Sequence, residues 1–177
     1  MVTERMDKLP LGDLTAKLRN SIGNPREGLP KEAFLLVSEL TPLINVDLLV
    51  KNNQGETLLT WREDEYYGPG WHVPGGIVRF KERFSARIRA VAKNELGVPV
   101  QADDMPLVMN EVMAAHRDVR GHFISLLYRC HLLGAPARHL EHVHGMPKNG
   151  EWKWHAGSPD NLLPAHEMYR KYIDGQT

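Results

Sequence analysis

One acidic side chain stands where an apolar one is expected. At about 100° per residue along a helix, Phe84, Ile88, Val91 and Glu95 fall within one narrow arc. This arc should face the core, where an unpaired carboxylate costs several kcal/mol. We therefore expect Glu95 to meet a cation, a metal ion or a hydrogen-bond network. The plain alternative is a surface glutamate in the last turn before Gly97.

A pair of glycines, Gly75 and Gly76, precedes this helix. Without a Cβ atom, their backbone can come close to Glu95 or to a ligand, although two glycines after Pro74 are also typical of a simple tight turn. A peptide carbonyl and a carboxylate together suit a hard cation. Magnesium prefers oxygen ligands and often bridges a protein carboxylate to substrate phosphates. The combination indicates a Mg²⁺ site that would serve a diphosphate ligand.

The elements that position these residues are strands and helices in mixed order. Two helices are expected, at 81–96 and 159–173, and residues 66–71, rich in Gly, Pro and aromatic residues, are predicted to be a loop. Strands are expected in four segments, the first two joined as a hairpin: 42–50, 56–61, 106–114 and 122–133. This order predicts an α/β class with a mixed sheet covered by helices.

The chain divides into a short appendage and one domain. Residues 1–38 are polar, turn-rich and weakly helical, so we interpret them as an N-terminal arm, and 39–177 as the main domain. The length of 177 residues suits one domain with a substantial core.

Composition excludes several classes of protein. With 22 basic and 22 acidic side chains and a pI near 7.1, the chain has no extended basic field for nucleic acid. No stretch approaches the roughly 20 apolar residues of a membrane span. The single cysteine, Cys130, lies in an apolar run and is expected to be buried rather than reactive. We therefore expect a cytoplasmic protein with a small-molecule partner, and no nucleic acid or membrane partner.

The spacing of the glycines and acids resembles a known motif. Gly76, then Glu82, then Glu95-Leu-Gly97-Val98 resemble the Nudix box. Where the common box has Arg-Glu and Glu-Glu pairs, this chain has Ala90-Val91 and Asn94-Glu95. The GDP-mannose mannosyl hydrolase branch shows the same loss. The chain is similar to that branch over roughly residues 41–160, in these segments: 41–47, 55–62, 70–76, 94–97, 122–123 and 152–154.

The resemblance implies a fold, a reaction and a set of roles. The fold is the Nudix-type α/β/α sandwich with a mixed sheet, the metal is Mg²⁺ or Mn²⁺, and the assembly is a homodimer. Water would attack C1 of a nucleotide sugar and release the nucleoside diphosphate. Gly75 through its carbonyl and Glu95 would bind the metal, Arg62 would contact the diphosphate, and Asp47 would contact the sugar or guanine region. In the plainer interpretation, Asp47 ends strand pairing and Arg62 lies at the surface.

Some residues depart from this family pattern. Ile77 replaces an arginine that would contact the leaving group. The family's Gln-His pair, a metal ligand and a general base, aligns without gaps to Lys148-Asn149, which can do neither job. A gapped alignment places Glu141 as the metal ligand and His142 as the base, since a histidine with pKa near 6.5 suits general-base catalysis. The choice among the acids and histidines of this loop stays open: Glu141, His142, His144 and Glu151.

Three functions are therefore compatible with the sequence. The first is a metal-dependent hydrolase of a nucleoside diphosphate sugar, such as GDP-mannose. The second is a Nudix diphosphohydrolase that cleaves a P–O bond of another nucleoside diphosphate derivative. The third is a Nudix-fold nucleotide-binding module that has lost catalysis.

Overall fold

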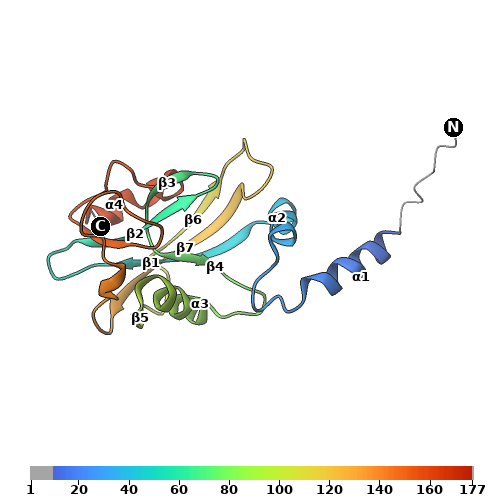
Figure 1. Ribbon diagram of the computed structural model, residues 1–177, viewed down its shortest axis with the longest axis horizontal. Coiled ribbons are helices and arrows are strands. Elements are labelled where there is room, and N and C mark those ends of the chain that lie inside the picture. The colour runs from blue at the N-terminus through green and yellow to red at the C-terminus, as the bar shows by residue number, and fades with distance from the viewer. Residues whose placement is uncertain (1–9, 177) are drawn as a thin grey trace.

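The computed structural model describes residues 10–176, which form two sheets flanked by helices (Figure 1). The larger elements are, in chain order, α1 (Leu11–Ile22), α2 (Lys31–Leu40), β1 (Leu43–Val50), β2 (Thr57–Asp64), β3 (Gly68–His72), β4 (Gly75–Ile77), α3 (Phe84–Val91), β5 (Val100–Ala102), β6 (Val108–Met113), β7 (His122–Leu132), β8 (Trp152–His155) and α4 (Arg170–Ile173). Three short helices complete the chain: the π-helical turn η1 (Ala92–Leu96) and the 3-10 helices η2 (Arg138–Leu140) and η3 (Pro164–Tyr169).

The larger sheet is mixed, as the sequence predicts. Its order is β4-β1-β7-β5, and β6 also pairs with β7. Strands β1 and β7 are parallel, whereas β4, β5 and β6 pair antiparallel with their neighbours. The second sheet is antiparallel, in the order β3-β2-β8.

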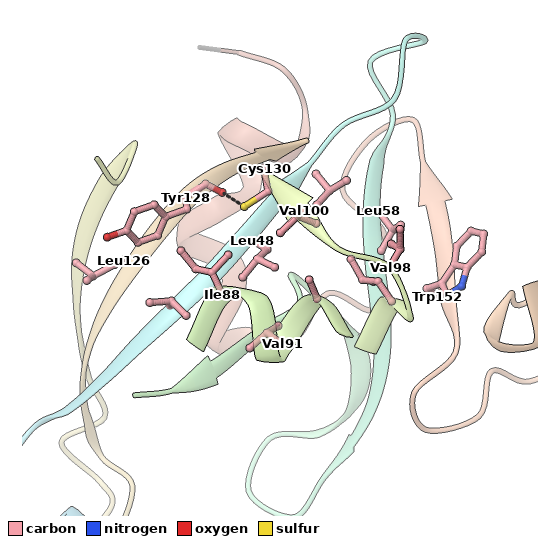
Figure 2. Packing of buried hydrophobic residues seen from close by; sticks show 14 residues of the cluster. Leu48, Leu58, Ile88, Val91, Val98, Val100, Leu126, Tyr128, Cys130 and Trp152 are labelled. Carbon is pink, nitrogen blue, oxygen red and sulfur yellow. Dashed lines mark hydrogen bonds between the residues drawn. The ribbon is translucent and has the colours of Figure 1, made fainter. Parts of the chain in front are cut away.

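Helices cover the sheets on two sides, which makes the fold an α/β/α sandwich. Side chains alternate along a strand, so β1 contributes Leu48 to one face and Leu49 to the other. Leu48 packs with Ile88 and Val91 of α3 in the core drawn in Figure 2. Leu49 packs in a second core with residues of η3 and α4, among them Tyr169. The expected fold class is confirmed.

Two local predictions were wrong. Residues 68–71 of the expected loop form β3 together with His72, because they pair along β2 from Thr60 to Asp64. The expected hairpin of 42–50 and 56–61 is limited to its turn. Asn52 closes that turn with bonds to residues 54–56, and Lys51 bridges Thr57, but beyond this point β1 and β2 enter different sheets.

The helix that carries Glu95 is also more complex than the predicted segment 81–96. Regular α-helix runs from Phe84 to Val91, and the chain then widens into the π-helical turn Ala92–Leu96 before Gly97 ends it at φ 67°. The predicted helix at 159–173 is instead η3 followed by α4. Cys130 is 1% exposed, as expected of a packing residue.

The expected N-terminal arm, 1–38, contains α1 and most of α2; residues 1–9 lie outside the described part of the chain. No residue of α1 is buried, and the helix runs away from the sheets (Figure 1). In α2, Ala33 and Ser38 are buried. Among residues 10–176, no helix has the length and apolar character needed to cross a bilayer.

Candidate active site

A pocket of about 170 Å³ is lined by residues of β1, β2, β4, β7 and the helix η3. Three of the six predicted site residues line it: Asp47, Arg62 and Gly75. Ile77, at the position where the resemblance expects an arginine, also lines it. The sheet topology explains this meeting, because β4 pairs with β1 and places Gly75 directly beside Asp47.

Asp47 is a buried acid at the wall of this pocket. It is 3% exposed, and Tyr169 of η3 donates its hydroxyl to Asp47 Oδ2 at 2.7 Å. Burial raises the pKa of Asp47 to about 7, although the Tyr169 bond and the charge of Arg62 act in the opposite direction. A Cβ atom on Gly75 would collide with Asp47 Oδ1, so any other residue here would displace the Asp47 carboxylate. Asp47 is thus part of the pocket and does more than end a strand.

Glu95 lies just behind the pocket wall and does not point to bulk solvent. Its side chain is 21% exposed, and the hydroxyl of Thr60 donates to Glu95 Oε2 at 3.0 Å. The same oxygen is 3.6 Å from Nε2 of His72, a residue that lines the pocket. Burial raises the pKa of Glu95, but His72, the charge of Arg62 and the Thr60 bond outweigh it and hold the pKa below its usual value. Glu95 is therefore a carboxylate beside the pocket.

Two arginines give the pocket a cationic side. Arg62 and Arg120 both line it and flank the carboxylate of Asp64. Arg120 Nη2 is 3.6 Å from Asp64 Oδ2, and its guanidinium lies over the ring of Tyr66 at 4.6 Å. Burial raises the pKa of Asp64, but the backbone amides of residues 66 and 67 and the two arginines lower it below its usual value. Within residues 10–176 the Arg62 side chain makes no hydrogen bond, so its donors are available to a ligand.

A histidine of η3 adds a neutral donor. The amide of Val73 donates to Nδ1 of His166 at 3.2 Å, which leaves the ring proton on Nε2. Burial, with the charges of His72 and Arg62, holds the pKa of His166 well below its usual value. His166 lines the pocket. It is therefore placed to donate a hydrogen bond to a ligand oxygen.

The structure does not bring Glu141 and His142 to this pocket. Glu141 is exposed and bridges Trp152, which in turn pairs with Thr60. Two strand spacings separate the backbone of Glu141 from that of Thr60, or about 10 Å. The ring of His142 packs edge-on against Trp71, and its Nδ1 forms a hydrogen bond with Glu151 Oε2 at 2.9 Å. Their assignment as metal ligand and base remains a prediction from the gapped alignment.

Glu82, the other acid of the resembling motif, has a structural role. It accepts hydrogen bonds from the Arg79 amide at 2.9 Å and from Nε of the buried Arg87 at 2.8 Å. These bonds fix the loop that enters α3. Among residues 10–176, no three His, Cys, Asp or Glu side chains converge as a metal cluster. A cation near Glu95 would therefore need ligands from the backbone, water or the substrate, which is a set that Mg²⁺ accepts.

The sequence comparisons agree with this geometry. The family model described as the NUDIX domain matches residues 41–168. The chain belongs to the NUDIX domain family. The NUDIX match begins directly after α2 and includes every residue of the pocket wall named above.

One curated relative and two solved structures show how the NUDIX domain compares. The low-salt glycan biosynthesis protein Agl8 of Haloferax volcanii is 35% identical over 85 residues, 48% of this chain and 54% of that protein, so the chain spans about half the length of the relative. A MutT NUDIX hydrolase from Burkholderia pseudomallei has a TM-score of 0.59 and 20% identity, covering 77% of this chain and 98% of that one. The MutT protein of Methanosarcina mazei Go1 has a TM-score of 0.56 and 18% identity, covering 77% and 96%. Both structures share the fold.

Three residues that line the pocket were not predicted, namely His72, Arg120 and His166, and neither was Tyr169, which bonds Asp47 from behind the pocket. Glu95 could be identified from its helical spacing. These other residues come from β3, a loop and η3, whose sequences show no periodic pattern. The histidine in the segment Gly70-Trp-His72-Val was the one available sign, because a polar residue there interrupts an otherwise apolar run.

Proposed function

We propose that this NUDIX domain is a divalent-metal-dependent hydrolase of a nucleoside diphosphate sugar. The observation that carries the proposal is the union, in one pocket, of Asp47, Arg62 and Gly75, with the Glu95 carboxylate behind its wall. An anionic ligand with a polar, uncharged end fits this arrangement, because the cations lie on one side and the buried acid on another. The relative Agl8 is named a glycan biosynthesis protein, and that name agrees with a ligand that contains a sugar.

The divalent ion fits the donors that are present. The bare Cα of Gly75 leaves its peptide open to a close neighbour, and Glu95 offers an oxygen held in place by Thr60. Glu95 and the carbonyl of Gly75 would hold Mg²⁺ or Mn²⁺, with the remaining positions left to water and phosphate oxygens. When bound, such an ion neutralises charge that develops on the departing diphosphate.

The side chains of the chain itself bind and orient the substrate. Arg62 and Arg120 would hold the phosphates. The Arg120 guanidinium would replace the positive charge of the arginine that the resemblance expects at position 77, where this chain has isoleucine. The Nε2–H of His166 would donate to an ester or phosphate oxygen. Asp47 would accept hydrogen bonds from sugar hydroxyls, because it lies at the buried end of the pocket.

The size of the pocket limits what it encloses. Pockets for whole ligands of this class measure about 300–1,000 Å³, whereas this one measures about 170 Å³. The sugar and phosphates would fill it, and the base would lie at the mouth. Tyr67 lines the pocket there, whereas Trp71 is 4% exposed and packs on Trp61 in the core. The Arg117 guanidinium lies over the Tyr67 ring at 3.8 Å, so Tyr67 would contact the base with its other face or its edge.

Hydrolysis in heavy-oxygen water tests the proposal directly. The protein is incubated with a panel of nucleotide sugars and Mg²⁺ or Mn²⁺, and the products are analysed by mass spectrometry. Label in the released sugar supports attack at C1, and Glu95→Gln should abolish that turnover. Label in a phosphate would instead establish P–O cleavage. Thermal shifts without any turnover across the panel would favour the binding module.

A further inference from the structure

His72 presents one ring nitrogen, Nε2, to Glu95, and the hydroxyl oxygen of Thr60 lies 3.3 Å from the same nitrogen. The ring is 2% exposed, at the end of β3. Its Nδ1 lies 2.7 Å from the carbonyl oxygen of Thr60, which can only accept a hydrogen bond. Nδ1 therefore carries a proton, and in the neutral imidazole the lone pair is on Nε2. Nε2 is the atom that faces Glu95.

The distance between these two groups suits a shared ion. His72 Nε2 and Glu95 Oε2 are 3.6 Å apart, outside the 2.7–3.2 Å range of a direct N–H···O hydrogen bond. Metal bonds to imidazole nitrogen and carboxylate oxygen are each about 2.1 Å, so together they span up to about 4.2 Å. The separation of the two atoms is therefore compatible with one cation bound to both.

Hydrogen bonds with neighbouring atoms orient both His72 and Glu95, as is typical of metal ligands. A histidine that binds a metal almost always donates its other ring N–H to a carboxylate or carbonyl, as His72 does to Thr60. The hydroxyl of the same threonine donates to Glu95 Oε2 at 3.0 Å and fixes the carboxylate. Thr60 thus positions both atoms from a single residue of β2.

The motif around this helix offers no second acid for this task. Of the positions that carry acids in the common Nudix box, Val91 is apolar and packed in the core, and Asn94 is an amide. Glu82 is engaged by Arg79 and Arg87. An ion at Glu95 therefore has one carboxylate from this helix, and the imidazole of His72 lies 3.6 Å from that carboxylate, beside the Thr60 hydroxyl at 3.0 Å.

We propose that His72 is a nitrogen ligand of the divalent ion, beside Glu95 and the carbonyl of Gly75. The inference rests on the proposed function, because it concerns the same metal. An imidazole ligand favours transition metals over Mg²⁺, which prefers oxygen. The site should consequently bind Mn²⁺ more tightly than Mg²⁺. The opposing interpretation is a protonated His72 that pairs with Glu95 and only stabilises the fold.

Pulsed electron paramagnetic resonance of the Mn²⁺-loaded full chain tests the assignment, because a directly bound imidazole nitrogen modulates the electron spin echo. The variants are His72→Phe and His72→Gln, the second of which keeps a donor for the Thr60 carbonyl if the first does not fold. His166→Phe is the matched control, since its ring lies 5.6 Å from that of His72. Calorimetric titrations with Mn²⁺ and Mg²⁺ accompany each variant.

The proposal predicts nitrogen modulation in the wild type and in His166→Phe, and its loss in both His72 variants. Mn²⁺ affinity should fall about ten- to a hundredfold in the His72 variants, and Mg²⁺ affinity less. A wild-type complex without nitrogen modulation, whose Mn²⁺ affinity still falls in Glu95→Gln, would overturn the role of His72 and leave the proposed function intact. If the wild type binds neither ion, both the inference and the metal-dependent function fail.

Discussion

Replacement of His155 by phenylalanine should remove part of the acid sensitivity of the fold. His155 ends β8, where its ring packs edge-on against Trp71 with centroids 4.7 Å apart. Within residues 10–176 its Nε2 is buried and has no hydrogen-bond partner. Burial, together with the charges of Lys153 and His142, lowers the pKa of His155 to about 4, although Glu56 acts in the opposite direction. Phenylalanine keeps the aromatic contact and removes the proton site.

The sign and size of the effect follow from this pKa. Between pH 6.5 and about 4 the unfolded chain binds a proton at His155 that the native protein does not, so stability is lost as the pH falls through this window. The shift from 6.5 to about 4 corresponds to roughly 3 kcal/mol at about 1.36 kcal/mol per unit. Solvent reaches part of the ring, so we halve this figure and expect about 1–2 kcal/mol.

Urea unfolding at pH 7.5 and pH 4.5 measures the difference. The wild type should lose about 1–2 kcal/mol more free energy of unfolding than His155→Phe between these two pH values. His139→Phe is the matched control, because His139 is exposed in η2, and it should keep the wild-type dependence. Equal pH dependence in the wild type and His155→Phe would refute the reasoning.

Three further predictions concern the core and the site. Burial raises the pKa of Cys130 to about 12, so native protein at pH 8 should resist alkylation that unfolded protein undergoes within minutes, and rapid labelling of the native form would contradict this. Tyr169→Phe removes a 2.7 Å bond to buried Asp47 and should reduce the free energy of unfolding by about 2 kcal/mol by urea titration; an unchanged value would show that the bond contributes nothing. Gly97→Ala should destabilise by about 1–3 kcal/mol in the same assay, because φ is 67° and the new Cβ would lie 2.6 Å from Cβ of Ala137, and a neutral result would contradict that strain.

The strands that the sequence predicted well are those with a local pattern. Residues 42–50 and 122–133 contain β1 and β7, whose apolar runs are buried in the two cores. Residues 106–114 contain β6, whose side chains alternate between half-buried and exposed. Strand β3 was missed, because glycine and proline in 66–71 are typical of loops. Its strand geometry comes from pairing along β2, which no local pattern reports.

From periodicity alone, only the site residue on a helix could be predicted. Glu95 was found from its spacing after Ile88 and Val91, and the structure places it beside a pocket, although in a π-helical turn that widens the helix. The glycine pair was found from the sequence itself, and Asp47 and Arg62 came from the resemblance; the pairing of β4 with β1 brings Gly75 to Asp47, and Arg62 of β2 lines the same pocket. His72 was not found, because its neighbours are supplied by β2 and by the end of the helix.

The central claim is that Glu95 holds a divalent ion beside this pocket. Isothermal titration of the full chain with Mg²⁺ and Mn²⁺, in the wild type and in Glu95→Gln, tests it most directly. Glutamine can still accept the Thr60 hydroxyl, so the melting temperature should change little, while affinity for both ions falls at least about tenfold. Equal affinity in the two proteins, with the fold intact, would contradict the account.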